Sequence, residues 1–200
     1  MRVCVFCGSH SGNHEAFGQQ AVALGKLLAQ HQMGLVYGGA NVGLMKMLAE
    51  AFMEEGGHAI GVIPHFLAEK HLVQPNLNET IYVDTMQERK ILMADHADAF
   101  VALPGGYGTL EELFEVITAS QLGLHRKPLI LANINGFYDN LLAHRDTMIM
   151  NGFVDEVHRN TLVGASGAEE IIDAIKSYSA PVATKYIEQV HEKFNGKQTN

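Results

Sequence analysis

One stretch, LPGGYGTLEELFE at positions 103–115, combines glycines, hydroxyl groups and carboxylates in a pattern suited to ligand binding or catalysis. Gly105, Gly106 and Gly108 permit a tight turn and leave no side chain over the backbone N–H groups. From Thr109 onward the apolar residues recur with a helical period, so the turn leads into a helix N-terminus. Free N–H groups and the positive end of the helix dipole then converge on one point, which favours a phosphate.

An apolar run leads into this turn, because residues 99–103 (AFVAL) have the length and composition of a buried parallel strand. Pro104 cannot donate the next ladder hydrogen bond and so ends the strand. A simpler interpretation stays open. Thr109 and Glu112 have the spacing of a capping box, in which the two side chains only close the helix N-terminus. The stretch alone therefore predicts either a phosphate site or a capped helix.

Two adjacent cations, Arg89 and Lys90, form the second set of candidate residues. The apolar pattern predicts a helix over residues 86–96 with both cations in its first turn, where positive charge opposes the helix dipole. A nearby anion would justify that placement, whereas an isolated surface Arg-Lys pair is usually only solvated.

The elements that must position these residues alternate along the chain. Strands are expected at residues 3–6, 35–37, 59–63, 81–83, 99–103, 128–132 and 162–163, and helices at 13–31, 42–55, 86–96, from 109, 137–150 and 168–178. This alternation predicts an α/β fold with a single-domain, doubly wound parallel sheet of the Rossmann-like kind and helices on both faces. We expect residues 1–180 to form the domain and 181–200 a C-terminal helical extension, with Tyr186, Val190 and Phe194 on one face.

In open parallel sheets the ligand lies beyond the carboxyl ends of the strands, near the point where the strand order reverses. The post-strand segments that meet there are Gly8-Ser9, Gly38-Gly39, residues 85–90 and residues 104–109. None has the G-x-G-x-x-G spacing of a dinucleotide site or the pattern of a Walker P-loop. A mononucleotide or sugar phosphate therefore fits better than NAD or ATP.

Composition excludes several classes of partner. The 22 acidic and 14 basic residues give a net charge of −8, which would repel the backbone of a nucleic acid polymer. The apolar run before Gly8 is too short for a signal sequence, and no stretch approaches the length of a membrane span. We therefore expect a cytoplasmic protein that binds neither nucleic acid nor membrane.

The cysteines and histidines do not predict a metal site. Cys4 and Cys7 have C-x-x-C spacing, but residues three apart on a strand point to opposite faces. His10 and His14 are four apart with a glycine between them and no third ligand nearby, which argues against zinc. We expect no metal and no other cofactor.

Together the motifs resemble the LONELY GUY family of cytokinin riboside 5′-monophosphate phosphoribohydrolases, formerly classed as lysine decarboxylase-like proteins. The resemblance covers about residues 2–172. It rests on PGGYGTLEE at 104–112, ERK at 88–90, YGG…GLM between 37 and 45, VFCGS at 5–9, QLGLH at 121–125 and NINGFYDNLL at 133–142.

The resemblance implies hydrolysis of the N-glycosidic bond of a purine nucleoside 5′-monophosphate to free base and ribose 5-phosphate, by a homodimer with sites near the subunit interface. The family's catalytic pair maps onto Arg89 and Glu112. The carboxylate could stabilise an oxocarbenium-like state, hold ribose hydroxyls or activate water, and the guanidinium could bind phosphate or orient the carboxylate. With the turns above, the expected substrate-binding residues are Gly8, Ser9, Gly38, Gly39, His71, Lys90, Gly105, Gly106, Tyr107, Gly108, Thr109, Leu110, Glu111 and Thr118.

Some positions depart from the family pattern, namely Ala40, Lys46, His71 and Ala119. They leave the catalytic pair intact but do not determine which base the pocket accepts. A cytokinin monophosphate and AMP therefore both remain candidate substrates.

Two other functions are alternatives to this one. A non-catalytic carrier on the same fold, like the molybdenum-cofactor carrier proteins, would use the phosphate site only to bind, and a carboxylate at Glu112 argues against it. A pyridoxal-phosphate lysine decarboxylase needs a Schiff-base lysine, and Lys46, Lys90 and Lys127 lie in no recognisable setting for one.

Overall fold

The computed structural model describes residues 1–180, so the predicted face of Tyr186, Val190 and Phe194 lies outside the described residues. The strands are β1 (Arg2–Phe6), β2 (Gly34–Tyr37), β3 (Ala59–Pro64), β4 (Glu79–Val83), β5 (Ala99–Ala102), β6 (Leu129–Ala132) and β7 (Val163–Ala165). The helices are α1 (Glu15–Gln30), α2 (Gly43–Glu54), α3 (His65–Ala68), α4 (Met86–Asp95), α5 (Tyr107–Gln121), α6 (Asp139–Met150) and α7 (Ala168–Ser177), with 3-10 turns η1 (Ile134–Gly136) and η2 (Glu156–Thr161).

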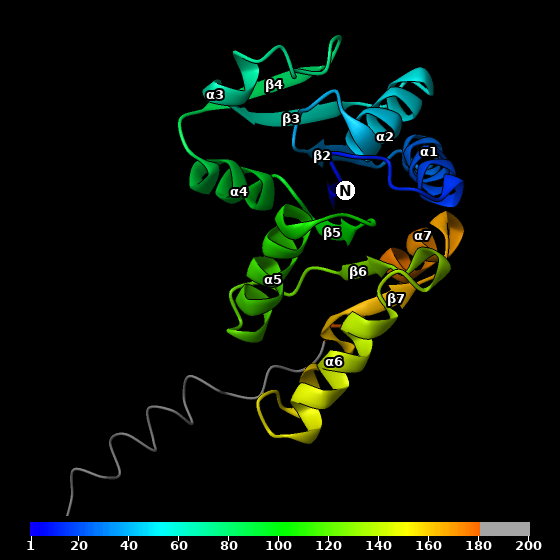
Figure 1. Cartoon of the computed structure of the whole chain (residues 1–200), viewed down its shortest axis with the longest axis vertical. Helices are drawn as coiled ribbons and strands as arrows, with labels where there is room; N and C mark the ends of the chain where they lie inside the picture. Colours follow the sequence, from blue (N-terminus) through cyan, green and yellow to red (C-terminus); the bar gives the residue numbers. More distant parts are fainter. Residues whose placement is uncertain (181–200) are drawn as a thin grey trace, which may run out of the picture.

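These strands form one parallel sheet in the order β4-β3-β2-β1-β5-β6-β7. In Figure 1 the labelled strands run from β4 at the top through β3, β2, β5 and β6 to β7, with α1, α2 and α7 to the right and α4 and α5 to the left. The predicted doubly wound α/β fold is confirmed. The chain builds outward from β1 to β4 and then returns to the centre at β5, so the strand order reverses between β1 and β5.

Apolar cores cover both faces of the sheet, because side chains of a strand alternate between its faces. In β1, Val3 and Val5 pack in the core under α1, α2 and α7, whereas Cys4 and Phe6 pack in the core under α4 and α5. Cys7, just after the strand, belongs to the first core. The two cysteines are free and lie on opposite sides of the sheet, as their spacing predicted.

Two helix starts determine where the candidate site residues lie. Helix α5 begins at Tyr107, two residues earlier than the periodicity indicated, because the extended backbone of Gly106 already serves as its N-cap. Helix α4 begins at Met86, which places Arg89 and Lys90 in its second turn and not in its first. In the described part of the chain, no helix is both long and apolar enough to cross a membrane.

Candidate active site

Two post-strand turns are joined at the point where the strand order reverses. The Gly8 N–H donates to the carbonyl of Pro104 over 3.0 Å, and the Leu44 N–H at the start of α2 donates to the carbonyl of Gly8 over 3.1 Å. A Cβ on Gly105 would collide with the Thr109 side chain and lie 2.9 Å from the nitrogen of Gly8. Glycine at 105 therefore lets the two turns approach each other.

The N-terminus of α5 is open. Its N-cap residue is Gly106, which provides no side-chain cap, and a Cβ at Gly106 or Gly108 would meet nothing within 4 Å. The capping box proposed for Thr109 and Glu112 is wrong, because the helix has already begun at Tyr107 and the carboxylate points elsewhere. The first amides of α5 thus remain available to an anion.

The carboxylate of Glu112 instead pairs with Arg89 of α4. Nη1 of the guanidinium lies 2.9 Å from Oε1 of the carboxylate, and each residue is only 8% exposed. Nε of Arg89 donates to the carbonyl of Val62 in β3 over 3.0 Å, which fixes the plane of the guanidinium. A Cβ on Gly38 would collide with the guanidinium, so only glycine at the end of β2 leaves room for it.

Burial and the neighbouring guanidinium act in opposite directions on the Glu112 carboxyl. Removal from water raises the pKa of the Glu112 carboxyl above its ordinary value, and the guanidinium of Arg89 opposes that rise. Burial, reinforced by the Glu112 charge, also raises the pKa of the Cys4 and Cys7 thiols, which therefore stay neutral. The site presents one carboxylate whose ionisation depends on its cationic neighbour.

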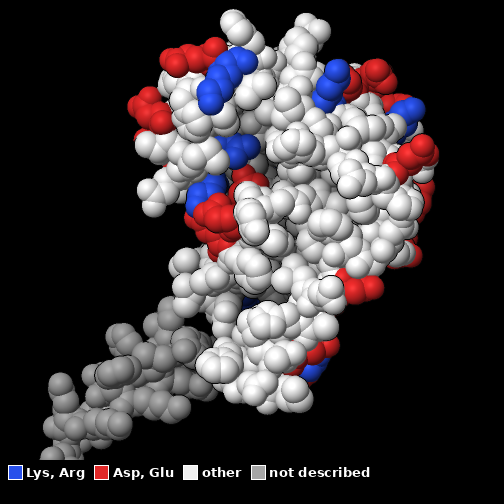
Figure 2. Space-filling view, viewed as in Figure 1, with Lys and Arg blue, Asp and Glu red and all other residues white. Residues whose placement is uncertain are grey.

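The ion pair opens into a cleft of about 370 Å³. The cleft contains Ser9 of the first turn and the start of α5, and three thioethers, from Met45, Met86 and Met93, contribute to its wall. An adjoining hollow of about 290 Å³ shares Ser9 and Gly106 with it. Figure 2 shows positive and negative side chains side by side over α4 and α5.

The structure brings most, but not all, of the predicted residues together. Beside the ion pair, the cleft is lined by Ser9, Gly38, Gly106, Tyr107, Gly108, Thr109 and Glu111. Gly8 and Gly105 line the adjoining hollow. Outside both hollows lie Gly39, His71, Lys90, Leu110 and Thr118.

The positions of these outer residues have local causes. The Thr118 hydroxyl donates to the carbonyl of Phe114 over 2.8 Å within its own helix. Gly39 adopts a φ of +71° and packs against the backbone of Gly61, which requires glycine there. His71 is exposed in the segment between α3 and β4. Lys90 is paired with carboxylates of α5.

Sequence reasoning missed the methionine wall. Met86 and Met93 stand three residues before and four residues after Arg89, so all three share one face of α4. That spacing is visible in the sequence, but methionine at helical spacing is more often part of a core. Only the position of α4 beside the cleft distinguishes the two cases.

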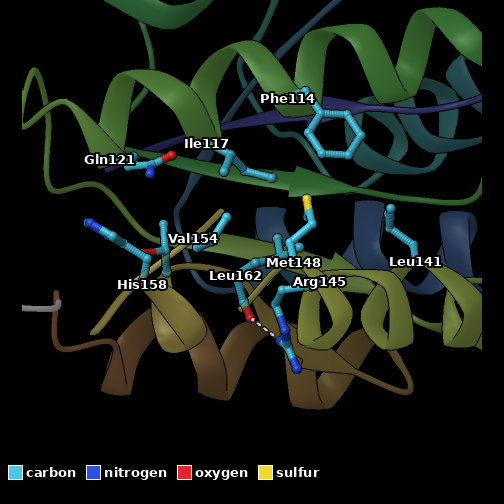
Figure 3. Close-up of a pocket in the computed structure, with 10 residues that line it drawn as sticks. Phe114, Ile117, Gln121, Leu141, Arg145, Met148, Val154, His158 and Leu162 are labelled. Carbon is cyan, nitrogen blue, oxygen red and sulfur yellow. Dashed lines mark hydrogen bonds between the residues drawn. The ribbon is translucent and has the colours of Figure 1, made fainter. Parts of the chain in front are cut away.

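A second surface of α5 is apolar and faces α6. Figure 3 shows Phe114, Ile117, Met148, Val154 and Leu162 turned into a groove between these helices. Phe114 is 41% exposed there. The Arg145 guanidinium donates to the Leu162 carbonyl over 3.4 Å below the groove.

Comparison with known proteins identifies relatives of this chain. A family model described as "Possible lysine decarboxylase" matches residues 45–175. The cytokinin riboside 5′-monophosphate phosphoribohydrolase LOG2 of Arabidopsis thaliana is 46% identical over 177 residues, which are 88% of this chain and 83% of the relative. LOG5 of the same plant is also named a cytokinin riboside 5′-monophosphate phosphoribohydrolase. It is 45% identical over 88% of this chain and 78% of the relative's length.

Solved structures show the same fold. The molybdenum cofactor binding protein from Rippkaea orientalis superimposes with a TM-score of 0.68 at 25% sequence identity. The match covers 88% of this chain and 95% of that one.

Proposed function

The chain belongs to the LONELY GUY family of cytokinin riboside 5′-monophosphate phosphoribohydrolases, and we propose that it hydrolyses the N-glycosidic bond of a purine nucleoside 5′-monophosphate. Water would add across the bond, so that the hydroxyl joins C1′ of ribose 5-phosphate and a proton goes to the free base. The observation that carries this proposal is the buried Arg89–Glu112 pair beside an uncapped helix N-terminus.

The phosphate is held, in this proposal, at the start of α5. The amides that follow Gly106 have no side-chain cap, and the helix dipole adds favourable potential for an anion. Binding energy at the phosphate orients the sugar for reaction, although the phosphate itself does not react.

Glu112 acts on the sugar. Cleavage of a glycosidic bond passes through an oxocarbenium-like state, and a carboxylate beside C1′ stabilises that charge and directs the attacking water. Arg89 keeps the carboxylate ionised and, through its bond to the carbonyl of Val62, holds it in one position.

The carrier alternative has weaker support. The molybdenum cofactor protein shares the fold at 25% identity, whereas the plant hydrolases are 45–46% identical over most of their length. A protein that only binds an anion also gains nothing from a buried carboxylate near it, since the two negative charges repel.

The lysine placements argue against decarboxylase chemistry. Lys46 pairs with Glu50 on the surface at 3.9 Å, and the ammonium of Lys127 donates to the carbonyl of Ala94 over 2.9 Å. Lys90 is held by carboxylates of α5. Within residues 1–180, no lysine lines the cleft where a Schiff base would have to form.

We also propose that the protein is a homodimer, as the family relationship implies. The apolar groove between α5 and α6, with Phe153 82% exposed nearby, is a candidate surface for that contact. Light scattering on the wild type and on Phe114→Asp tests it: a dimer that the substitution converts to a folded monomer supports the surface, and a wild-type monomer refutes the dimer.

A nucleotide panel tests the function directly. Purified protein is incubated with AMP, isopentenyladenosine 5′-monophosphate and adenosine, and the free base is quantified by chromatography. We expect base and ribose 5-phosphate from the monophosphates and far less base from adenosine. Nucleotide binding without base release would favour the carrier, and neither binding nor release would refute both. The preferred monophosphate identifies the substrate.

A further inference from the structure

The motif NINGFYDNLL at 133–142 lies outside the cleft of Glu112, at the carboxyl end of β6. Its first six residues, 133–138, form a turn that we call the post-β6 turn. The Asn133 N–H donates to the carbonyl of Ala165 over 2.7 Å, which ties the turn to the end of β7. The Asn133 side chain accepts from the Tyr138 N–H and donates to Asp139, each over 2.7 Å. These bonds hold the turn in one conformation.

Two aromatic side chains of the post-β6 turn lie beside the phosphate site proposed at the start of α5. The ring of Phe137 lines the hollow of about 290 Å³ that adjoins the cleft. It packs edge-on against Phe17 of α1 at 5.5 Å and against the ring of Tyr138 at 4.7 Å. Tyr138 is only 2% exposed, and its hydroxyl donates to the carbonyl of Leu103 over 2.7 Å. The turn therefore borders the hollow with one ring and reaches the end of β5 with the other.

The carbonyl of Leu103 depends on this phenol. Leu103 is fully buried, and no backbone N–H of residues 1–180 donates to its carbonyl. A buried carbonyl without a donor destabilises the conformation that contains it. Burial raises the pKa of the Tyr138 hydroxyl above its ordinary value, so the group keeps its proton and remains a donor. The phenol thus supplies the hydrogen bond that the sheet does not.

Three hydrogen bonds fix the entry to the glycine turn. The Leu103 N–H donates to the carbonyl of Phe6 in β1 over 2.9 Å. The carbonyl of Pro104 accepts from the Gly8 N–H over 3.0 Å. Both of these bonds join backbone groups, whereas the third comes from Tyr138, a side chain 35 residues further along the chain. The open start of α5 follows directly, so a rotation of the chain at Leu103 would redirect its amides.

We propose that Tyr138 is a positioning residue for the phosphate site. Its hydroxyl fixes the carbonyl of Leu103 and thereby holds the glycine turn where the first amides of α5 converge on the phosphate. The inference rests on the proposed function and deepens it, because it assigns a role in substrate binding to a side chain that lines neither hollow. A purely structural role would instead affect all ligands alike.

The test is a titration of nitrogen-labelled protein with ribose 5-phosphate, followed by NMR of the amides of residues 105–109. We expect Tyr138→Phe, which keeps the ring and removes the hydroxyl, to raise the Kd by roughly three- to tenfold. The matched control is Tyr37→Phe, which removes another buried hydroxyl, one without a hydrogen-bond partner within residues 1–180. The control should leave the Kd unchanged. An unchanged Kd in Tyr138→Phe would overturn the inference.

Turnover separates positioning from stability. In Tyr138→Phe the KM for AMP should rise by the same factor as the Kd, while kcat and the kcat/KM for adenosine stay within about twofold of the wild type. Equal losses on AMP and adenosine would overturn the inference, because adenosine has no phosphate to position. If Tyr138→Phe does not fold, Asn133→Ala, which frees the Tyr138 N–H, takes its place, and an unchanged Kd there overturns the inference.

The titration needs no turnover, so the two proposals fail in different ways. A wild type that binds ribose 5-phosphate at these amides but releases no base refutes the hydrolase function and leaves the effect of Tyr138→Phe measurable. A wild type whose amides at residues 105–109 do not respond to ribose 5-phosphate overturns the inference itself.

Discussion

The spacing Thr-x-x-Glu occurs at the starts of two neighbouring helices, with opposite results. In α4 the Glu88 N–H donates to the Thr85 hydroxyl over 3.1 Å, and the Glu88 carboxylate accepts from the Thr85 N–H over 3.2 Å. In α5 the same spacing, Thr109 to Glu112, makes neither bond, and the carboxylate pairs with another helix.

An anion site requires open backbone amides, and the two helix starts differ in how many they leave open. At the start of α4, the side chains of Thr85 and Glu88 accept from the N–H groups of Glu88, Thr85 and Asp84, so fewer amides are open to a ligand. Helix α5 has a glycine as its N-cap, leaves its first amides without a side-chain cap, and directs Glu112 inward to a cation. The same two residue types therefore stabilise one helix and, in our proposal, perform chemistry in the other.

The largest expected effect comes from Glu112→Gln. If this carboxylate stabilises the reacting sugar, base release should fall by roughly 10²-fold or more, the scale of one electrostatic or acid–base group. The chain should remain folded, because glutamine can still accept from Arg89. The matched control is Glu88→Gln, the same substitution in the capping box, and equal loss of turnover in both variants would contradict the comparison.

Arg89→Gln should reduce turnover and also destabilise the fold. It leaves a buried carboxylate without its cation, at a cost of about 3 kcal/mol in the free energy of unfolding at neutral pH. Urea denaturation measures the cost, with Arg126→Gln as control, because Arg126 is a surface residue outside the cleft. Wild-type stability and turnover in Arg89→Gln would show that Arg89 is not part of the active site.

The same variant has a defined pH dependence. Burial already raises the folded-state pKa of Glu112 above its unfolded value, and loss of Arg89 raises it further. A group with a raised folded pKa favours folding at low pH and opposes it once the pH passes that value. The penalty in Arg89→Gln should thus shrink as the pH falls from about 8 to about 4, and an increasing penalty would contradict this assignment.

A smaller effect is expected from Gly106→Ala. The added methyl meets no atom of the protein within 4 Å but occupies space over the open helix start. We expect unchanged stability and a KM for AMP raised by roughly tenfold, equivalent to about 1.4 kcal/mol. Gly105→Ala is the contrasting variant, because its methyl collides with Thr109 and should destabilise the fold by about 1–3 kcal/mol. An unchanged KM in Gly106→Ala would place the phosphate elsewhere.

The smallest effect is expected from Thr85→Ala. Loss of the cap should cost about 1 kcal/mol in the free energy of unfolding and leave kcat unchanged. Thermal denaturation and the base-release assay measure the two quantities. A strong loss of turnover would mean that both Thr-x-x-Glu segments serve the reaction.

Much of the fold and part of the site could be predicted from local patterns. Apolar runs that alternate with helical periodicity are sufficient for a parallel α/β sheet, because each element must bury its own apolar face. The glycine turn after β5 and its place at the sheet's carboxyl edge follow from the same reasoning. The observed reversal of strand order between β1 and β5 agrees with this prediction. The placement of Cys4 and Cys7 on opposite faces of the sheet agrees with it as well.

Residue types and their spacing are therefore sufficient to predict the set of helices and strands and the candidate site residues. Tertiary structure alone decided which Thr-x-x-Glu segment is a cap, and which of Arg89 and Lys90 is buried at the cleft. Spacing fixes the angular position of a side chain on its helix, but its partner depends on which helix lies beside it. Helix α4 reaches α5 only because the chain crosses back from the edge strand β4 to β5 at the centre of the sheet.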